Sequence, residues 1–569
     1  MNAPQIARTH LTDGGAIADR ATTFAERGFL EPIRLFSASQ RTLLLNHLIR
    51  GKKGEPDTWF KGRAANDRLC FDMATRPGLL AILRLLLGED IVLWGVTPIK
   101  LRPGQSHAWH VDIESAPPEK RLVSVWIGLS NTSPASGLTF VSRSHAFGKT
   151  IQQVQHERGL RRGEADDRTV LSWAREFDAS AELVQPEVGD GDALIFDGRI
   201  WHKSLNNRES GARIALLLQY ARADVPVFMP APGHYEWPFQ LVTAKRPPVV
   251  VVSGTGDAET NRQVPPPPAR PKNLSRLVTQ VSQFSAPLPD PERKGWQPHP
   301  IFRGSTDTHD FLSCHASVLA PHNIPHPPHA HIEEEILIVL EGNAELLLGN
   351  DQDLEKAEAH PAGAGTFVYY PAYRYHTLRS VGPGPLTYLM FKWRSGPFET
   401  VEILDTKIVD TADRSAKPPK PWQTWLLFER PTNFLRKLHA HLSEVTPGSG
   451  YEPHRDAYDV AILLLSGRIE TLGCTVEPFG VVYYAAGEPH GLRSVGTEPA
   501  RYIVFEFHGA SGKPRKTDAT EPRQRKQDAT LAAGNNSAIS AGSKKIEAPG
   551  QEKTFLERLK KLAMAPLWH

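Results

Sequence analysis

The chain has 569 residues, of which 40% are hydrophobic and 23% are charged. This length exceeds what a single hydrophobic core fills, so we expect about two to four domains. The net charge is only +3, and residues 511–569 alone carry twelve Lys and Arg against six Asp and Glu. The remaining chain is slightly acidic, which argues against a nucleic-acid partner.

The three cysteines, Cys70, Cys314 and Cys474, are far apart and form no paired motif. Unpaired cysteines suit a reducing compartment. The N-terminus lacks an apolar stretch of signal-peptide length, and no segment approaches the roughly 18 apolar residues of a membrane span. We therefore expect a cytoplasmic protein without an integral membrane segment.

The first part of the chain, residues 1–250, mixes helical and strand patterns. Ser37 and Gln40 form a capping-box pair before an apolar run, and Pro77 and Gly88 bracket a second helix over residues 77–87. Short segments rich in β-branched and aromatic residues predict strands, and residues 151–180 predict a helical insertion. The expected strands cover residues 91–101, 121–129, 138–143, 193–197 and 213–221. The mixture predicts helices packed outside a double-sheet β jelly roll, also called a double-stranded β-helix.

Beyond this domain the sequence changes in character. Residues 251–295 are proline-rich, with a PPPP run at 265–268, and predict a stiff linker. An internal repeat follows: HTLRSVG from His376 recurs as HGLRSVG from His490, and ILIVLEGNAEL recurs loosely as AILLLSGRIET. Two related β units, at 296–410 and 411–510, are the simplest account.

The last segments have a different composition again. Residues 511–551 are polar and predict a disordered tail, and residues 552–566 predict a short amphipathic helix with basic residues around its apolar face. Whether this basic helix docks on the protein itself, on a partner or on a membrane surface stays open.

The jelly-roll region contains a pattern suited to oxygen activation at iron. Two histidines and a carboxylate on one face of the metal leave the opposite face open for oxygen and a co-substrate. His110 and Asp112, two residues apart on a strand, point to the same side, and His202 lies on a distant predicted strand. His-x-Asp alone is weak, since HRD at 454–456 is a second instance. Arg213 adds a fork-shaped cation that pairs with a carboxylate.

In these motifs residues 22–225 resemble the phytanoyl-CoA dioxygenase family. The resemblance rests on IKLRPG, HVD, VSVWIGLS, SGLTFVSRSH, GDALIFDGRIWHKS and RIALLLQY, in the family's order. It implies a dioxygenase that uses Fe(II), O₂ and 2-oxoglutarate to hydroxylate a small molecule, releasing succinate and CO₂. By the same resemblance, the iron ligands and catalytic residues are His110, Asp112 and His202; Arg213, Lys100 and Ser204 bind 2-oxoglutarate; and Trp126 forms the site wall.

The segment PHPPHAHIEEEILIVLEG resembles the first motif of the cupin family, and Gly365, Pro371 and His376 resemble the second, although Tyr373 stands where a glycine is usual. The resemblance implies two tandem cupin barrels and a divalent transition metal in the first one. We expect Glu333 and Glu334 to be exposed neighbours of that site. Its expected ligands are His329, His331, Glu335 and His376.

The second cupin unit is degraded. His454 and His490 remain, Asp456 replaces a histidine, and Asp459 falls one position early for a ligand, on the other face of a strand. We expect no metal there. One alternative is a second 2-oxoglutarate site, because Arg501 follows His490 at the spacing seen between His202 and Arg213.

The leading interpretation is thus an Fe(II)- and 2-oxoglutarate-dependent dioxygenase with a bicupin partner module. A carbohydrate or specialised metabolite is the substrate class we favour. One alternative is a cupin-centred metal enzyme, either a sugar isomerase or epimerase or a dioxygenase. Another is a ligand-binding scaffold. A homodimer through the cupin domains is a further hypothesis.

Overall fold

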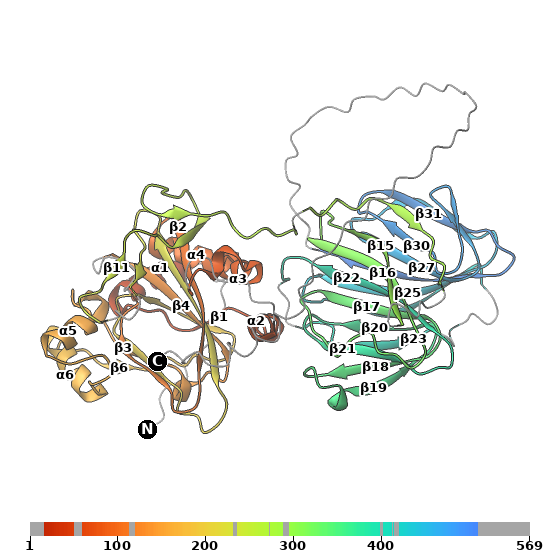
Figure 1. Cartoon of the computed structure of the whole chain (residues 1–569). Helices are drawn as coiled ribbons and strands as arrows, with labels where there is room; N and C mark the ends of the chain where they lie inside the picture. Colours follow the sequence, from red (N-terminus) through yellow and green to blue (C-terminus); the bar gives the residue numbers. More distant parts are fainter. Residues whose placement is uncertain are drawn as a thin grey trace, which may run out of the picture. The chain divides into compact units, whose positions relative to one another are not determined.

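The computed structural model describes residues 16–50, 60–112, 120–231, 236–271, 273–287, 295–398, 402–411, 414 and 420–509. The expected tail at 511–551 and the helix at 552–566 lie outside these residues. Strands dominate the described part, as the sequence predicts (Figure 1). No helix in the described ranges is long and apolar enough to cross a membrane.

The N-terminal domain is built on two β-sheets. The large one has the order β1-β7-β4-β9-β2-β12-β13 and the small one β3-β8-β5-β6, with a separate β10-β11 pair. The large sheet comprises β1 (Ile33–Arg34), β7 (Asp192–Asp197), β4 (Leu122–Ser130), β9 (Arg213–Arg222), β2 (Ile91–Leu101), β12 (Pro248–Ser253) and β13 (Arg262–Gln263). The others are β3 (Ser106–His110), β8 (His202–Leu205), β5 (Leu138–Val141), β6 (Leu183–Val184), β10 (Met229–Pro230) and β11 (Leu241–Val242).

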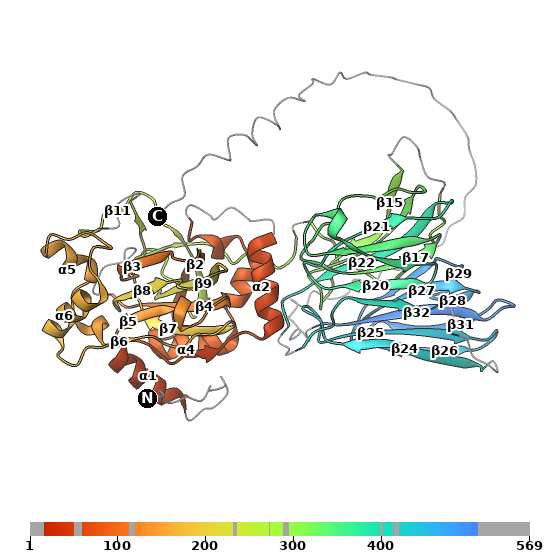
Figure 2. The same ribbon diagram turned by 90° about the horizontal axis from the view of Figure 1, so that it is seen from below.

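The helices of this domain begin and end where local signals place them. Ser37 and Gln40 exchange the two capping-box bonds at the start of α2, of 3.1 and 3.3 Å. Pro77 opens α4, and Gly88 ends it with a φ of 86°. The pair α5 and α6 forms the expected insertion, beside the small sheet (Figures 1 and 2). The α-helices are α1 (Ala16–Arg27), α2 (Ala38–Arg50), α3 (Arg68–Ala74), α4 (Pro77–Leu87), α5 (Ile151–Glu157) and α6 (Asp167–Phe177), with 3-10 turns at Arg63–Ala65, Pro134–Ser136 and Ser144–Ala146.

The predicted linker, residues 251–295, is more structured than we expect from its composition. Its first residues belong to β12, which pairs antiparallel with β2, and β13 then pairs parallel with β12. Further along, β14 (Gln280–Ser282) pairs with β30 (Val481–Tyr484) of the last sheet. Proline removes one backbone donor but is tolerated at a sheet edge or at the start of a strand, as at Pro248. The segment therefore contributes edge strands to two sheets.

The two C-terminal units have the same architecture, as the repeat predicts. The first has sheets β15-β16-β22-β17-β20-β23 and β19-β18-β21. The second has β14-β30-β27-β32-β25-β24 and β26-β31-β28-β29. The first unit contains β15 (Trp296–Gly304), β16 (Phe311–Leu319), β17 (Glu334–Glu341), β18 (Ala344–Gly349), β19 (Glu358–Ala362), β20 (Thr366–Tyr370), β21 (Tyr375–Ser380), β22 (Leu386–Arg394), β23 (Lys407–Asp410) and a 3-10 turn at Leu354–Lys356. The second contains β24 (Trp422–Arg430), β25 (Lys437–Val445), β26 (Gly450–Arg455), β27 (Asp459–Ser466), β28 (Ile469–Thr471), β29 (Cys474–Val476), β30, β31 (Pro489–Ser494) and β32 (Ala500–His508).

The two six-stranded sheets of these units lie against each other (Figure 2). Aromatic side chains make contacts between them. Phe391 contacts Phe505 at 5.6 Å between ring centroids, and Trp393 contacts Phe507 at 5.3 Å. Each unit keeps a second apolar cluster between its own two sheets. The large sheets are therefore buried on both faces, one toward the partner unit and one toward the interior of their own barrel.

Two buried acids lie in this interface, at matching positions of the two units. Glu334, which we expect from the sequence to be exposed, is fully buried. Its carboxylate accepts hydrogen bonds from Tyr369, Trp393, Thr432 and Asn433, at 2.6–3.1 Å. The expectation fails because Glu334 and Glu335 point to opposite faces of β17, and the face of Glu334 is covered by the other barrel.

Asp459 is the counterpart of Glu334 in the second unit. It accepts bonds of 2.8–3.0 Å from Thr306, Thr308, His309, Tyr483 and the Ala486 backbone. Burial alone would raise the pKa of Asp459, but the hydrogen bond and positive charge of His309 bring it to about 2. The prediction that Asp459 lies on the wrong face for a barrel ligand is confirmed.

We predict that Glu334→Ala destabilises the cupin pair by roughly 3–5 kcal/mol, because it leaves several buried donors without an acceptor. The measurement is the free energy of unfolding by urea denaturation of the full chain. Glu341→Ala, at the exposed end of the same strand, is the matched control and should change stability by less than about 0.5 kcal/mol. Equal effects of the two substitutions would contradict the assigned role of Glu334.

Candidate metal centres

The sequence-predicted iron ligands meet between the two sheets of the N-terminal domain. His110 ends β3, His202 begins β8, and the two residues are directly paired in the small sheet. Asp112 follows two residues after His110 on the same side of the chain. Its Oδ1 lies 3.7 Å from His110 Nε2 and 3.8 Å from His202 Nε2. One atom from each residue is therefore within reach of a single metal ion.

Neighbouring groups fix which atoms face this point. Each imidazole donates its Nδ1–H to the backbone carbonyl two residues earlier, at 2.7 Å for His110 and 2.9 Å for His202. Ser124, which the sequence reasoning missed, donates to Asp112 Oδ2 at 2.8 Å and leaves Oδ1 toward the histidines. Burial lowers the pKa of both imidazoles, which favours the neutral form that a metal needs. These orientations are the supporting contacts that metal ligands commonly have.

A buried arginine lies beside this centre. Arg213, on β9 of the large sheet, is fully buried and donates from Nη2 to Ser204 Oγ at 3.1 Å. Ser204 is two residues after His202 on β8, so the bond spans the two sheets close to the ligands. The guanidinium carbon also lies 5.1 Å from the ring centre of Trp126. The structure thus brings Arg213, Ser204 and Trp126 together, as the sequence predicts.

The charge of Arg213 lacks a carboxylate partner among the described residues. Its Nε and Nη1 are buried without any hydrogen-bond acceptor in that part of the chain. Burial lowers the pKa of Arg213 to about 10, which still leaves the group charged at neutral pH. A buried cation with two unused donors is costly unless an anion joins it. The site is therefore suited to a carboxylate ligand.

The prediction for Lys100 is not supported. Lys100 is exposed and lies opposite Ile214 in the β2–β9 pairing, whereas Arg213 lies opposite Leu101. Directly paired residues project to the same face, so Lys100 projects away from the face of Arg213. Ile99, which alternates with Lys100 along β2, packs with the apolar cluster around Trp126 instead.

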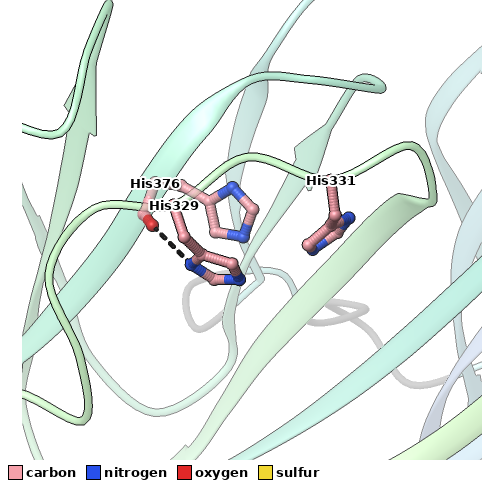
Figure 3. A group of neighbouring side chains, drawn as sticks. All are labelled: His329, His331 and His376. Carbon is pink, nitrogen blue, oxygen red and sulfur yellow. Dashed lines mark hydrogen bonds between the residues drawn. The ribbon is translucent and has the colours of Figure 1, made fainter. Parts of the chain in front are cut away.

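The residues of the second predicted metal site lie together inside the first cupin barrel. His329 pairs with His376 through two backbone bonds of 3.1 Å, which bring loop and strand together. Glu335 Oε2 lies 3.1 Å from His331 Nε2 and 3.4 Å from His376 Nε2. Figure 3 shows the three imidazoles gathered beside one another, with the 3.2 Å bond from His329 Nδ1 to the His376 carbonyl dashed. The donor atoms of the three histidines thus lie within 4.8 Å of one another, and Glu335 lies beside two of them, His331 and His376.

Unused acceptors support a cation at this site. His376 Nε2 and Glu335 Oε1 are buried without a hydrogen-bond partner in the described residues. His331 and His376 donate Nδ1–H to backbone carbonyls, at 2.9 and 2.8 Å, which leaves their Nε2 atoms on the side of Glu335. Three imidazoles and one carboxylate are a donor set suited to a divalent first-row transition metal.

Lys392 is a member of this site that the sequence reasoning missed. Its Nζ lies 3.0 Å from Glu335 Oε2 and 3.2 Å from His331 Nε2. Burial alone would raise the pKa of Glu335, but the Lys392 charge, together with His376 and His331, holds it well below its usual value. The sequence did contain a signal for Lys392. Side chains alternate along β22, and Tyr388 and Met390, four and two residues before Lys392, line the barrel interior, so Lys392 faces the interior as well.

The second cupin keeps part of this arrangement. Asp456 Oδ2 lies 3.5 Å from His454 Nε2 and 3.3 Å from His490 Nε2, and the two histidines are directly paired. The structure thus brings three donor atoms together in this barrel. The expectation that the barrel binds no metal stays a prediction. Arg501, however, donates to the backbone carbonyls of residues 411 and 414, at 3.0 and 2.6 Å. It alternates with Tyr502, which lines the barrel core, so it faces away and gives no support to a second 2-oxoglutarate site.

Comparison with family models finds one match in the N-terminal half of the chain and one in the C-terminal half. Residues 50–215 match the model described as "Phytanoyl-CoA dioxygenase (PhyH)", a range that contains His110, Asp112, His202 and Arg213. Residues 317–392 match the model described as "Cupin domain", and this range contains the predicted ligands of the first barrel. None of the curated proteins matches the chain.

Three solved structures that are similar to the chain each match less than half of it. A putative glyoxylate-induced protein from Pseudomonas aeruginosa is 16% identical, with 42% of this chain and 92% of that chain covered and a TM-score of 0.32. AerE from Microcystis aeruginosa is 14% identical, with 40% and 97% covered and a TM-score of 0.29. A cupin 2 conserved barrel domain protein from Leptotrichia buccalis is 13% identical, with 41% and 97% covered and a TM-score of 0.26.

These structural likenesses are too weak to bear on activity, so the family models carry the assignment. They indicate a metal-dependent enzyme of the dioxygenase type joined to a cupin module. The chain thus contains one segment that matches the phytanoyl-CoA dioxygenase model and another that matches the cupin model.

Proposed function

We propose that the N-terminal domain is an Fe(II)- and 2-oxoglutarate-dependent dioxygenase that hydroxylates a small molecule. The observation that carries this proposal is the buried, unpaired guanidinium of Arg213 beside a centre of two histidines and one carboxylate. The three-residue centre suits iron with open coordination positions. The arginine supplies what a dicarboxylate co-substrate needs at its far end.

Each residue then has a separate task. When bound, Fe(II) would supply the redox chemistry by which the C–H substrate, O₂ and 2-oxoglutarate become the hydroxylated product, succinate and CO₂. His110, Asp112 and His202 hold the metal from one side. Arg213 holds the distal carboxylate of 2-oxoglutarate through the N–H groups that Ser204 leaves unused. The apolar cluster around Trp126 excludes water from this end of the site.

For the substrate we favour a carbohydrate or a specialised metabolite, because a cupin module accompanies the oxygenase domain. Hydroxylation of an unactivated C–H group is the reaction that the site suits.

The first prediction concerns the ligands. Purified full-length protein supplied with Fe(II) should convert 2-oxoglutarate to succinate at a measurable rate without added substrate. Asp112→Ala should reduce succinate formation to background, since two imidazoles alone hold the metal poorly. His329→Ala, in the first cupin, should leave the rate unchanged. Succinate is measured by mass spectrometry, and full activity of Asp112→Ala would sink the assignment.

A second prediction compares the roles of Arg213 and Lys100 in binding 2-oxoglutarate. Arg213→Gln should raise the KM for 2-oxoglutarate roughly 10- to 100-fold, the cost of losing charge-assisted hydrogen bonds of about 1.5–3 kcal/mol. Lys100→Gln should change it less than about twofold, because Lys100 lies on the other face of β2. Initial rates of succinate formation give both values. A large effect of Lys100→Gln with none of Arg213→Gln would reverse the assignment.

A second candidate function lies in the first cupin and is favoured by the contact of Lys392 with Glu335 and His331. A metal held by His329, His331, Glu335 and His376 next to a lysine could support isomerisation or epimerisation of a sugar, or dioxygenation, with Lys392 moving a proton or binding an anionic group. If this centre carries the main activity, His329→Ala abolishes it and Asp112→Ala does not.

The lysine contact predicts how tightly the first cupin binds metal. The ammonium competes with a cation for the same acceptor atoms, so Lys392→Met should tighten Zn²⁺ or Mn²⁺ binding at least about tenfold. A chelator competition titration in an Asp112→Ala background, which disables the N-terminal centre, measures the affinity, and the binding step that is lost on adding His329→Ala is the one that belongs to the first cupin. Unchanged or weaker binding would show that Lys392 does not compete with the ion.

A further inference from the structure

The second cupin contains another group of potential ligands, on strands β25 and β32 of its large sheet. His439 and Glu506 are directly paired across these neighbouring strands, and His441 follows two residues after His439. The three side chains therefore project from the same face. That face is the interior of the barrel, because Val445 and Val504 on the same strands belong to its core. We call His439, His441 and Glu506 the β25–β32 cluster.

The donor atoms of this cluster are close enough to share one ion. His439 Nε2 lies 2.9 Å from His441 Nδ1 and 4.0 Å from Glu506 Oε1. With metal–ligand bonds of about 2.1 Å, neighbouring donors on a tetrahedral ion lie about 3.4 Å apart. The two distances bracket this value, so small side-chain rotations suffice. The side chains of His439 and Glu506 have exposed fractions of 18% and 17%, so both are in contact with solvent.

Supporting contacts already orient two of the three ligands. Glu429 accepts the Nδ1–H of His439 at 2.7 Å, which directs His439 Nε2 toward the cluster. His508 Nε2 donates to Glu506 Oε2 at 2.8 Å, which leaves Oε1 on the side of His439. A carboxylate behind a ligating histidine is a common arrangement at metal sites, where it fixes the tautomer and the ring orientation.

The first cupin shows that this cluster is not a general feature of the fold. In the first cupin, Ser313 and Lys392 occupy the positions that correspond to His439 and Glu506, and they pair with each other in the same way. Lys392 in turn pairs with Glu335 on β17, whereas Glu506 pairs with Val460 on β27. The carboxylate thus lies on the inner strand β17 in one barrel and on β32 in the other. In the second barrel the carboxylate of Glu506 therefore lies on the strand next to β25, beside the two histidines.

The cluster is also separate from the His454–Asp456–His490 group of the same barrel. That group lies on β26 and β31 of the small sheet and in the loop after β26, at the positions that match the first cupin's site. The β25–β32 cluster lies on the large sheet and has its own set of donor atoms within 4.8 Å of one another. The second barrel therefore offers two groups of ligands.

We propose that His439, His441 and Glu506 bind a divalent first-row transition ion at a site of their own. Two imidazoles and one carboxylate suit Zn²⁺ and its neighbours in this series. Three protein ligands leave at least one coordination position for water or a small ligand that enters the barrel.

The direct test is crystallographic and uses the unmodified protein. Crystals of the full chain soaked in ZnCl₂ should show an anomalous difference peak at the Zn edge between His439, His441 and Glu506. Crystals of Glu506→Gln should lose this peak. Asp456→Asn is the matched control, because it changes a carboxylate of the other group in the same barrel, and it should keep the peak.

Solution binding provides the second arm. After equilibrium dialysis against Zn²⁺, Glu506→Gln and His441→Ala should each bind about one ion fewer per chain than wild type, and the double variant should lose no more than either single variant, as expected for one shared site. Lys437→Ala, on the same strand, should bind as wild type does. No peak in soaked wild-type crystals, or an unchanged ion count in a folded double variant, would overturn the proposal and leave the cluster as a hydrogen-bonded network only.

Discussion

The alternation of side chains along a β-strand determines which residues of this protein can meet. Glu334 and Glu335 are neighbours in sequence, yet one accepts bonds in the interface between the barrels and the other faces the candidate metal site of the first cupin. The same rule separates Arg213 from Arg501. Both follow a site histidine by eleven residues, but only Arg213 faces the interior that holds the histidines, while Arg501 donates to backbone on the opposite side.

Packing of the large cupin sheets makes this separation possible. The aromatic contacts between them, such as Phe391 with Phe505, cover one face of each sheet and leave the other face free to carry polar groups. Glu334 and Asp459 add matched hydrogen-bonded acids to that interface. Because the interface stabilises both barrels, their interiors are able to differ. One interior pairs a carboxylate with Lys392, and the other places Glu506 beside two histidines.

Much of the fold and of the first site could be predicted from sequence because the signals are local or strongly patterned. Pro77 and Gly88 delimit a helix by their own backbone preferences, and strand β2 has the predicted bounds 91–101. The ligand sets could be identified because residues two apart on a strand share a face.

The features that sequence reasoning missed depend on pairing between distant segments. Three acids in a row at 333–335 do not reveal which face the other barrel covers. The short strand β14 is recognisable only through its partner β30, about 200 residues later. Lys100 is predicted from the sequence to bind the co-substrate, but the β2–β9 register places it opposite Ile214. In each case a long-range register, which the local sequence does not contain, decides the outcome.

In the function proposed above, the N-terminal domain holds 2-oxoglutarate by a metal and a buried arginine together. Anaerobic equilibrium dialysis of labelled 2-oxoglutarate against the full chain measures this binding. We expect about one molecule bound per chain, only with Fe(II) present, with binding lost in Asp112→Ala and kept in Glu335→Gln. Binding that survives Asp112→Ala and disappears in Glu335→Gln would contradict this function and place the co-substrate in the first cupin.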